Sequence, residues 1–323
     1  MINSIKGNKI CVIGAGYWGK NHIKTLQRLN ALNGIVEIDD NVLKTLLDNY
    51  SGVKGHSNVQ DAIEEGYDGY VIATPAQTHF EIAKLLIESN KNVLIEKPMT
   101  LSIKESEELV SLVNENKVSA MVGHVLLFHP ALKKIKKMIT SGDIGKLQYI
   151  YSNRLNLGKV RTEENVFWSF APHDIAIFQY LTDSIPKTIN AKGSAFLQEG
   201  IPDSTLMQLE YENKVKGHIF VSWLHPFKEH RLVVIGSEAM ISFEDSSNDK
   251  PLKLYSKKIN LSTGVPEEVD GPVKAISYEK RKPLDLELEY FLNHLTDNKP
   301  KIATIKHGHE VVKTLVYASQ QIL

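Results

Sequence analysis

The chain has 323 residues, the length of about two domains, and its 42% hydrophobic and 24% charged residues are ordinary values for a globular protein with buried cores. Lysines and arginines balance aspartates and glutamates at 38 each, so no basic field can hold a polyanion, and we expect neither nucleic acid nor an anionic membrane as a partner. The single cysteine, Cys11, excludes an internal disulfide, and because the sequence has no Cys/His zinc spacing we expect no metal.

The chain begins with Met-Ile-Asn-Ser-Ile-Lys-Gly-Asn-Lys, which lacks the apolar core of a signal peptide. No apolar run in the sequence approaches the roughly 18 residues that a membrane span requires. We therefore expect a cytoplasmic protein.

From Lys9 to about His129, short apolar runs alternate with amphipathic segments. The expected strands are Lys9–Ile13, Ile35–Asp39, Tyr70–Ala73, Asn92–Ile95 and Ser119–Gly123, and the helical stretches include Phe80–Glu88 and Ile103–Asn116. Ser102 and Glu105 have the Ser-x-x-Glu spacing of a capping box at the start of the second of these helices. Strands that alternate with helices predict a doubly wound parallel sheet.

After about Pro130 the pattern changes to longer strands in succession. The expected elements are a helix at Ala131–Ser141, strands at Leu147–Leu157, Thr188–Leu197, Leu206–Tyr211, Val215–Trp223, Arg231–Phe243 and Leu252–Tyr255, and helices at Ile175–Leu181, Leu284–Leu295 and His307–Gln321. Such an order predicts an α+β domain with a large, mostly antiparallel sheet that carries helices on one face and leaves the other open. We place the two domains at residues 1–126 and 127–323.

A Gly-x-Gly-x-x-Gly motif follows the first expected strand and opens a helix. Its residues are Gly14-Ala15-Gly16-Tyr17-Trp18-Gly19. In such a motif the first glycine permits a tight turn, the second lets the backbone approach a pyrophosphate, and the third allows close helix–strand packing. The free N–H groups of the helix N-terminus then attract the phosphates. The N-terminal domain is therefore expected to be a dinucleotide-binding Rossmann domain, with Gly14, Gly16, Tyr17, Trp18 and Gly19 at the cofactor.

The carboxylate Asp39 lies at the end of the second expected strand. In a Rossmann domain such a carboxylate accepts hydrogen bonds from the adenosine ribose and repels a 2′-phosphate, which favours NAD over NADP. Asp40 is an alternative for the same role, and a further alternative is that Asp39 only caps the next helix.

Two further motifs follow expected strands, Ala73-Thr74-Pro75 and Glu96-Lys97-Pro98. Because ligands bind outside the carboxyl ends of parallel strands, both motifs are expected at the cofactor, with Thr74, Pro75, His79, Glu96 and Lys97 as the contacting residues. A lysine at this position can also stabilise negative charge on a substrate oxygen.

Together with Ala171-Pro172-His173-Asp174-Ile175 and Lys282-Pro283-Leu284-Asp285-Leu286-Glu287, these motifs occur in an order that resembles the glucose–fructose oxidoreductase/inositol dehydrogenase/MocA (Gfo/Idh/MocA) family over nearly the whole chain. The resemblance implies a two-domain fold, NAD(P)-dependent hydride transfer on sugars or cyclitols, and homodimers or homotetramers that associate through the open sheet.

The resemblance also implies catalytic roles for two residues and a cis bond at Lys97–Pro98. Lys97 matches the lysine of Glu-Lys-Pro, and His173 matches the histidine that handles the hydroxyl proton, for which an imidazole has a suitable pKa. Many relatives have an aspartate four residues before this histidine, where this chain has Ser169. Asp174 or a backbone carbonyl would then have to orient the imidazole.

Within the family, Asn153-Arg154-Leu155-Asn156-Leu157-Gly158 and Trp168 with Ala-Pro-His-Asp are similar to a branch of bacterial nucleotide-sugar pathways that supply surface polysaccharides. Candidate substrate contacts, besides Lys97, are the polar or aromatic residues Arg154, Arg161, Trp168, Asp174, His225 and His124. Each could instead be an ordinary sheet-face or rim residue.

We therefore expect an NAD-dependent dehydrogenase that oxidises a secondary alcohol, with C3 of a UDP-N-acetylhexosamine or its uronate as the first substrate hypothesis. The alternatives are a cyclitol or free-aldose dehydrogenase, a keto-sugar reductase with the same residues, and an NAD-bound sensor or scaffold without turnover. Lys97 and His173 argue against the last of these.

Overall fold

The computed structural model describes residues 7–158, 160–162, 164–296 and 299–322, which group into two compact units. The first unit contains the described residues up to Phe128 together with Arg281–Val312, and the second contains His129–Lys280 and the described residues from Lys313 on. The sequence patterns do not predict this return of the chain to the first unit at Arg281. The division into domains after residue 126 stays a prediction.

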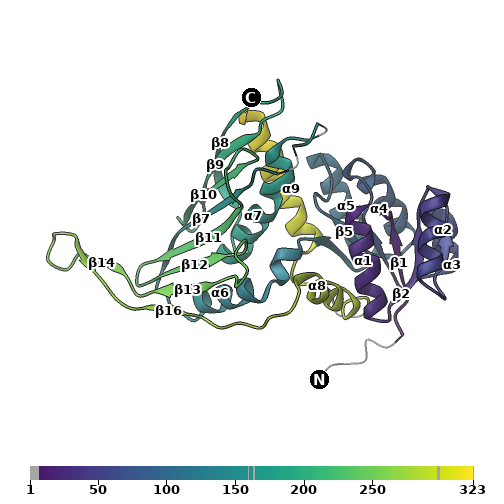
Figure 1. Ribbon diagram of the computed structural model, residues 1–323, viewed down its shortest axis with the longest axis horizontal. Coiled ribbons are helices and arrows are strands. Elements are labelled where there is room, and N and C mark those ends of the chain that lie inside the picture. Colours follow the sequence, from purple (N-terminus) through teal and green to yellow (C-terminus); the bar gives the residue numbers. More distant parts are fainter. Residues whose placement is uncertain (1–6, 159, 163, 297–298, 323) are drawn as a thin grey trace. The chain divides into compact units, whose positions relative to one another are not determined.

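The first unit is built on a six-stranded, wholly parallel sheet of order β3-β2-β1-β4-β5-β6 (Figure 1). This order confirms the predicted Rossmann fold. Between β1 and β4 the strand order reverses, and ligands bind at the carboxyl ends of the strands there. The strands are β1 Ile10–Ile13, β2 Leu32–Val36, β3 Lys54–His56, β4 Gly69–Ile72, β5 Asn92–Glu96 and β6 Ala120–Gly123.

Most helices of the first unit lie between these strands in sequence, whereas η2 and α8 follow β6. They are α1 Tyr17–Arg28, α2 Asp40–Asn49, α3 Val59–Glu65, α4 His79–Glu88, α5 Ile103–Asn116 and α8 Pro283–Leu292, with the short 3-10 helices η1 Ala76–Thr78 and η2 Val125–Phe128. The predicted cap of α5 is confirmed on one side, since the Ser102 hydroxyl accepts the Glu105 N–H at 3.1 Å. The second expected strand, Ile35–Asp39, was placed too late, because β2 ends at Val36.

The second unit contains an eight-stranded sheet of order β16-β13-β12-β11-β7-β10-β9-β8. All neighbouring strands are antiparallel except β7 and β10, so the predicted mostly antiparallel sheet is confirmed. The strands are β7 Leu147–Leu155, β8 Pro186–Ser194, β9 Ser204–Tyr211, β10 Lys216–Ser222, β11 Glu229–Gly236, β12 Met240–Glu244, β13 Leu252–Tyr255 and β16 Val273–Ala275.

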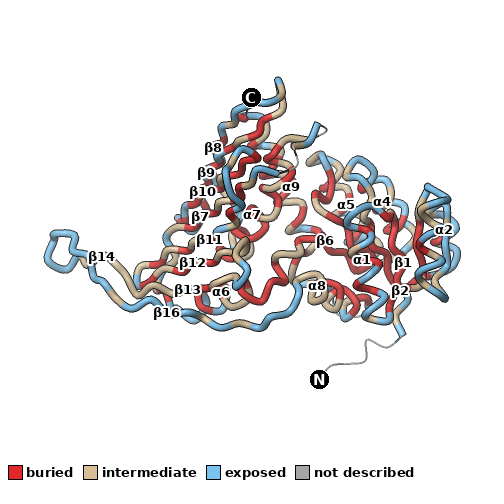
Figure 2. Tube along the Cα trace, viewed as in Figure 1, coloured by how far each residue is buried: buried red, intermediate tan, exposed pale blue. Residues whose placement is uncertain are grey.

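Two helices, α6 Pro130–Thr140 and α7 Val166–Thr182, cover one face of this sheet (Figure 1). Burial alternates along the strands, as in β9, where every second residue is buried (Figure 2). No described helix of the second unit lies on the opposite face, which is therefore open, as the sequence predicted. The last helix, α9 Ile305–Ile322, begins in the first unit, and its final turns belong to the second.

Two of the predicted elements of the second unit differ in the structure. The expected strand Arg231–Phe243 is a hairpin of β11 and β12, because the chain turns after Gly236. A side chain at Gly236 would lie 2.0 Å from the Ile144 carbonyl oxygen, so this position requires a glycine. The expected helix Ile175–Leu181 is the C-terminal part of α7, which begins nine residues earlier than predicted.

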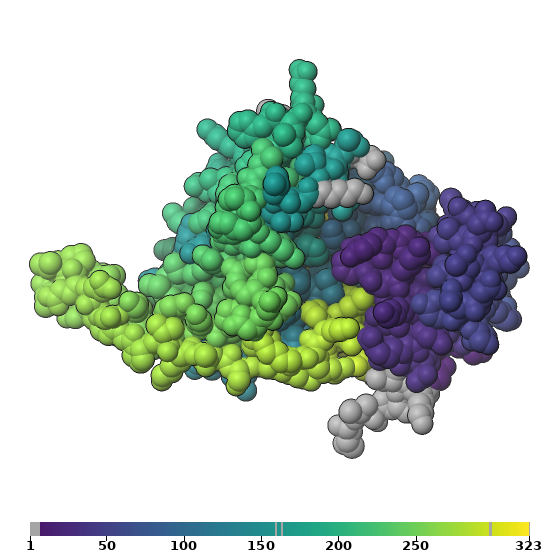
Figure 3. All heavy atoms as spheres, in the orientation of Figure 1, coloured from purple at the N-terminus to yellow at the C-terminus, as the bar shows by residue number. Residues whose placement is uncertain are grey.

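A separate hairpin of β14 Lys258–Asn260 and β15 Glu267–Val269 projects from the eight-stranded sheet (Figure 3). Its apolar side chains, among them Leu261 and Val265, are exposed. Within the described ranges, no helix combines the length and the apolar character needed to cross a membrane.

Candidate active site

The glycine loop after β1 has the geometry that a dinucleotide site requires. Gly14 has a left-handed φ of +89°, and a side chain there would collide with Thr74 in the loop after β4. A side chain at Gly19 would lie 1.9 Å from the Gly14 carbonyl oxygen, so only glycine lets α1 approach the loop this closely. Gly16, the N-cap of α1, faces open space. The first N–H groups of α1 can therefore receive an anion, and the loop fits a pyrophosphate.

Two residues between Gly16 and Gly19 belong to the same segment. Tyr17 is 83% exposed and Trp18 is 37% exposed. Both are thus accessible for the cofactor contacts predicted for them, which stay predictions.

Two carboxylates lie just beyond β2, and the structure gives them different contacts. Asp39 is the N-cap of α2, and its Oδ1 accepts the N–H groups of Asn41 and Val42 at 2.9 and 3.1 Å. Glu37, which directly follows β2, accepts the Ala15 N–H of the glycine loop at 2.8 Å. Asp39 therefore caps α2, and its contact with the ribose stays a prediction. Glu37 is a candidate for the ribose carboxylate that the sequence interpretation missed.

The loops after β4 and β5 are held together by a buried histidine. The two ring nitrogens of His79 each lie 2.9 Å from a carbonyl oxygen, one of Thr74 and one of Pro98. Burial lowers the pKa of His79, so the ring is neutral and donates to one of the two carbonyls. The Lys97–Pro98 peptide bond is cis, as the family resemblance implied.

Glu96 connects the base of this loop to α1. Its Oε1 lies 2.7 Å from Nε2 of the buried His22, and its Oε2 accepts the Lys97 N–H at 3.1 Å. Burial alone would raise the pKa of Glu96, but the hydrogen bond and the charge of His22 and the charge of Lys97 outweigh it, so this pKa lies below its usual value. The hydrogen bond from the Lys97 N–H to the buried Glu96 carboxylate therefore helps to fix the backbone of Lys97.

His124 directly follows β6, and β6 pairs with the strand that leads to Lys97. The side chain is only 2% exposed, and its ring packs edge-on against His307 at 5.6 Å. Burial holds the pKa of His124 well below its usual value, and the charges of His307 and Lys97 act in the same direction. A neutral, buried ring leaves little surface for a substrate to contact. The role of His124 as a substrate contact stays a prediction.

In the second unit, His173 lies on α7. The helix is capped by Asn165, whose side chain accepts the Trp168 N–H at 3.0 Å, and it contains Pro172. A proline has no backbone N–H, and its ring clashes with the carbonyl group four residues earlier in a helix. Sequence patterns therefore favour a helix that starts only after Pro172. The helix nevertheless continues through Pro172, so His173 lies well inside it.

Arg154 and Asp174, both predicted substrate contacts, bind each other. Arg154 on β7 donates from Nε to Oδ2 of Asp174 at 2.7 Å and from Nη2 to Oδ1 at 3.0 Å. Burial alone would lower the pKa of Arg154, but the charge and hydrogen bonds of Asp174 raise it. Both side chains are buried, and the fork occupies both carboxylate oxygens. Their substrate contacts stay predictions, but the geometry favours a role inside the unit.

The remaining predicted substrate residues lie where the strands of the second sheet end. The loops after β7, β8 and β10 are joined by backbone hydrogen bonds, Asn156 to Ser222 at 3.1 Å and Trp223 to Asp203 at 2.9 Å. Gln198 adds a bond to the Arg161 carbonyl at 3.0 Å.

Within these loops, the Arg161 side chain is about half exposed and pairs with Glu164. The His225 ring packs against Phe227, which is 59% exposed. Trp168, at the start of α7, donates from its indole N–H to the Ser319 hydroxyl at 2.9 Å. One sheet end therefore gathers Arg161, Trp168 and His225. In the portion of the chain that the structure describes, no group of three or more possible ligand residues could hold a metal ion.

Two family models match the chain. The Gfo/Idh/MocA model described as an oxidoreductase family with an NAD-binding Rossmann fold matches residues 8–124, and the model of the Gfo/Idh/MocA C-terminal domain matches residues 132–242.

Among curated relatives, the UDP-N-acetylglucosamine 3-dehydrogenase of Acidithiobacillus ferrooxidans is 25% identical over 303 residues, 93% of this chain and 93% of that protein. A solved structure of this enzyme has a TM-score of 0.85, at 22% identity, and the similarity covers 97% of each chain. The oxidoreductase YrbE of Bacillus subtilis is 28% identical over 215 residues, 62% of this chain and 63% of that protein. The scyllo-inositol 2-dehydrogenase (NAD(+)) of the same organism is 29% identical over 189 residues, 55% of each. The chain thus spans less than two thirds of these two Bacillus proteins.

Proposed function

Because the chain belongs to the Gfo/Idh/MocA family of NAD-binding oxidoreductases, we propose that it oxidises a secondary alcohol of a nucleotide sugar, at C3 of a UDP-N-acetylhexosamine or its uronate. The observation that carries this proposal is the similarity to UDP-N-acetylglucosamine 3-dehydrogenase, which spans 93% of both proteins. The presence of Lys97 directly before the cis Pro98 and of His173 in Ala-Pro-His-Asp supports turnover over a non-catalytic sensor.

The proposed cofactor site combines the glycine loop with the carboxylates beyond β2. The N–H groups at the start of α1 would receive the pyrophosphate, and Glu37 or Asp39 would face the adenosine ribose. A carboxylate at the ribose repels a 2′-phosphate. We therefore propose NAD as the preferred cofactor, and bound NAD in its oxidised form supplies the hydride acceptor.

In the proposed reaction, Lys97 and His173 act on one substrate hydroxyl. Lys97 donates a hydrogen bond to the oxygen and stabilises the negative charge that develops there. His173 in its neutral form accepts the hydroxyl proton, while the hydrogen on the same carbon leaves as hydride and the C–O single bond becomes a carbonyl. One proton on His173 and one hydride removed from carbon balance the two-electron oxidation.

A second candidate is a cyclitol or free-aldose dehydrogenase, or a keto-sugar reductase that runs the same steps in reverse. The similarity to scyllo-inositol 2-dehydrogenase favours it, although that alignment covers only 55% of each chain. Loops that gather Arg161 and exposed aromatic rings at one sheet end support a larger, charged substrate instead.

A substrate panel tests the proposal. NADH formation would be followed with UDP-N-acetylglucosamine, its uronate, several inositols and free aldoses, each with NAD and with NADP. We expect turnover with a UDP-N-acetylhexosamine or its uronate, and a ketone at C3 of the product by NMR. Turnover only with an inositol or an aldose would favour the second candidate, and no turnover with any compound in either direction would favour a sensor.

A further inference from the structure

The turn of α7 that carries His173 lacks a regular helical hydrogen bond. Pro172 immediately precedes His173 and has no N–H to donate to the carbonyl of Trp168 four residues earlier. The helix backbone is therefore weakened at the residue that the proposed reaction needs to hold in place. Contacts from outside the helix have to compensate.

Two contacts of the second unit hold this turn from either side. On one side, the Trp168 indole donates to Ser319 on α9 at 2.9 Å. On the other side, Asp174, the residue that follows His173, is held by the two-pronged hydrogen bond from Arg154 on β7. Arg154 and Asp174 are 9% and 2% exposed, so water does not compete for either group. Because the planar guanidinium of Arg154 hydrogen-bonds to both carboxylate oxygens, it fixes the orientation of the Asp174 side chain as well as its distance.

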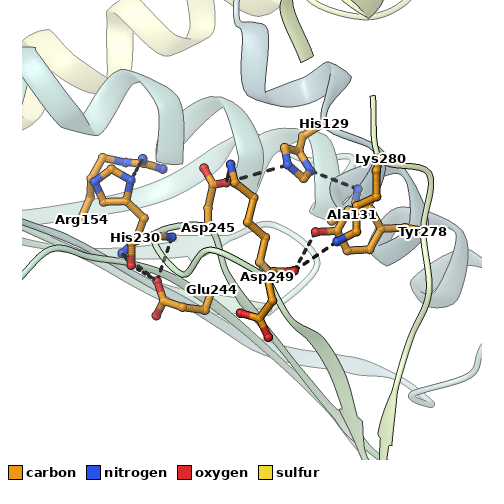
Figure 4. A network of polar contacts seen from close by, with 11 residues as sticks. His129, Ala131, Arg154, His230, Glu244, Asp245, Asp249, Tyr278 and Lys280 are labelled. Carbon is orange, nitrogen blue, oxygen red and sulfur yellow. Dashed lines mark hydrogen bonds and ion pairs between the residues drawn. The ribbon is translucent and has the colours of Figure 1, made fainter. Parts of the chain in front are cut away.

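Arg154 is itself held in place by the neighbouring strand (Figure 4). Its Nη1 lies 3.4 Å from Nδ1 of His230 on β11. Burial, with the Arg154 charge as the next cause, lowers the pKa of His230 to about 3, so this ring is neutral and can accept a hydrogen bond. The backbone N–H of His230 in turn donates to Oε1 of Glu244 at 3.1 Å. The guanidinium is thus confined between α7 and the sheet.

We propose that Arg154, acting through Asp174, is a positioning residue that orients the His173 imidazole for proton transfer. The inference rests on the proposed function, which makes His173 the proton acceptor. It accounts for the observation that both carboxylate oxygens of Asp174, the residue directly after His173, are bound by a buried arginine. Because adjacent side chains on a helix do not face each other, the effect reaches His173 through the helix backbone that the two residues share.

The test uses Arg154→Lys, which keeps the positive charge but loses the fork. We expect kcat to fall about 10- to 100-fold with little change in KM, because misplacement of a catalytic group by about 1 Å has an effect of this size. The acid limb of the pH profile of kcat/KM, which reports the proton acceptor, should shift. Arg231→Lys is the matched control, because Arg231 lies one residue from His230 on β11 and pairs with Glu244. That control should leave both readouts unchanged.

A double-mutant cycle separates positioning from mere support of the fold. If Arg154 acts through His173, Arg154→Lys should cause little further loss in a His173→Ala background. An equal loss in both backgrounds would overturn the inference and leave the proposed function standing. A raised KM with unchanged kcat would also overturn it, and would make Arg154 a substrate contact.

Full turnover of His173→Ala alone would refute the role of His173 as proton acceptor, and the inference with it, whereas failure of the proposed function would appear in the substrate panel. Should Arg154→Lys fail to fold, Asp174→Glu takes its place in the same cycle, since it keeps the charge and displaces the carboxylate by one methylene. As with Arg154→Lys, Asp174→Glu should then cause little further loss of kcat in the His173→Ala background, and an equal loss in both backgrounds would overturn the inference.

Discussion

At the scale of single residues, two carboxylates compete for the role that decides cofactor choice. Glu37 contacts the glycine loop through the Ala15 N–H, whereas Asp39 caps α2. We expect the wild-type protein to bind NAD(H) at least about tenfold more tightly than NADP(H), a difference of about 1.4 kcal/mol. Glu37→Gln should narrow this ratio in titrations with both cofactors.

Asp39→Ala is the companion variant. We expect this variant to keep most of the preference for NAD(H) over NADP(H). Its free energy of unfolding should fall by about 0.5–2 kcal/mol, as after the loss of a helix cap. If Asp39→Ala lost the preference for NAD(H) and Glu37→Gln kept it, Asp39 would be the carboxylate that contacts the adenosine ribose. Equal affinity of the wild-type protein for the two cofactors would refute both.

Sequence reasoning located the region of the ribose carboxylate, and two carboxylates there satisfy its spacing. Glu37 lies 21 residues and Asp39 23 residues after Gly16, so both satisfy the expected spacing of about 20. The decision depended on where β2 ends, and the apolar residue Ile38 favoured a late end although it is 87% exposed. The roles of Gly14 and Gly19 were predictable because a left-handed backbone at the first and a close approach at the second leave no alternative residue.

Glu287 on α8 is a buried carboxyl group whose protonation should be visible in stability. Its side chain is fully buried, and burial, with the charge of Glu96 second, raises its pKa well above the usual value. The folded protein therefore prefers protonated Glu287. Its stability falls as the pH rises from the pKa of the unfolded chain to that of the folded protein, by about 1.4 kcal/mol for each pH unit between the two values.

Glu287→Gln removes this titration. We expect the free energy of unfolding of the variant, relative to wild type, to increase with pH from about 4.5 upward, in urea unfolding at several pH values. Glu289→Gln on the same helix is the control, because Glu289 pairs with Arg281. A difference between Glu287→Gln and wild type that does not change with pH would show that Glu287 is ionised in the folded protein.

At the scale of elements, agreement follows the strength of the local signal. The α5 helix has the predicted bounds because an amphipathic pattern and a serine cap coincide there. The α7 helix was predicted too short because Pro172 usually marks a helix start, whereas here burial of nearly the whole helix and the Arg154–Asp174 pair outweigh that preference. Local patterns contain no information about such tertiary contacts.

The cap of α7 provides an element-scale prediction. Asn165→Ala removes the acceptor of the Trp168 N–H and should destabilise the protein by about 0.5–2 kcal/mol. Asn165→Asp keeps an acceptor at a helix N-terminus and should retain stability. Thermal unfolding of the two variants checks this, and equal melting temperatures for Asn165→Ala and wild type would show that the packing of α7 alone sets its start.

At the scale of the whole molecule, both sheet classes were predictable and the connections were not. Continuous apolar strands between helices specify a parallel sheet, and alternating strands in succession specify an antiparallel one. The parallel pairing of β7 with β10 and the return of α8 to the first unit depend on contacts between distant segments. The open face of the second sheet was predicted, and its partner remains a proposal.

We propose that this open face joins copies of the chain, as the family resemblance implies. Tyr151 and His218 stack there at 5.0 Å, and Tyr149 hydrogen-bonds His218 at 2.5 Å, so the face presents aromatic side chains without a helix over them in the described part of the unit. Tyr151→Glu should lower the mass measured by light scattering toward that of a monomer, whereas Lys137→Glu on α6 should not. A monomeric wild-type protein would contradict the proposal.

The central claim is that Lys97 and His173 act on one substrate hydroxyl, and the most direct measurement is the turnover of Lys97→Ala and His173→Ala on the nucleotide sugar identified by the panel. We predict losses in kcat of about 10²–10³ for Lys97→Ala and about 10²–10⁴ for His173→Ala. NAD affinity should change little in either variant, because the pyrophosphate and ribose contacts belong to other residues. Near-wild-type turnover in both variants would contradict the active-site assignment.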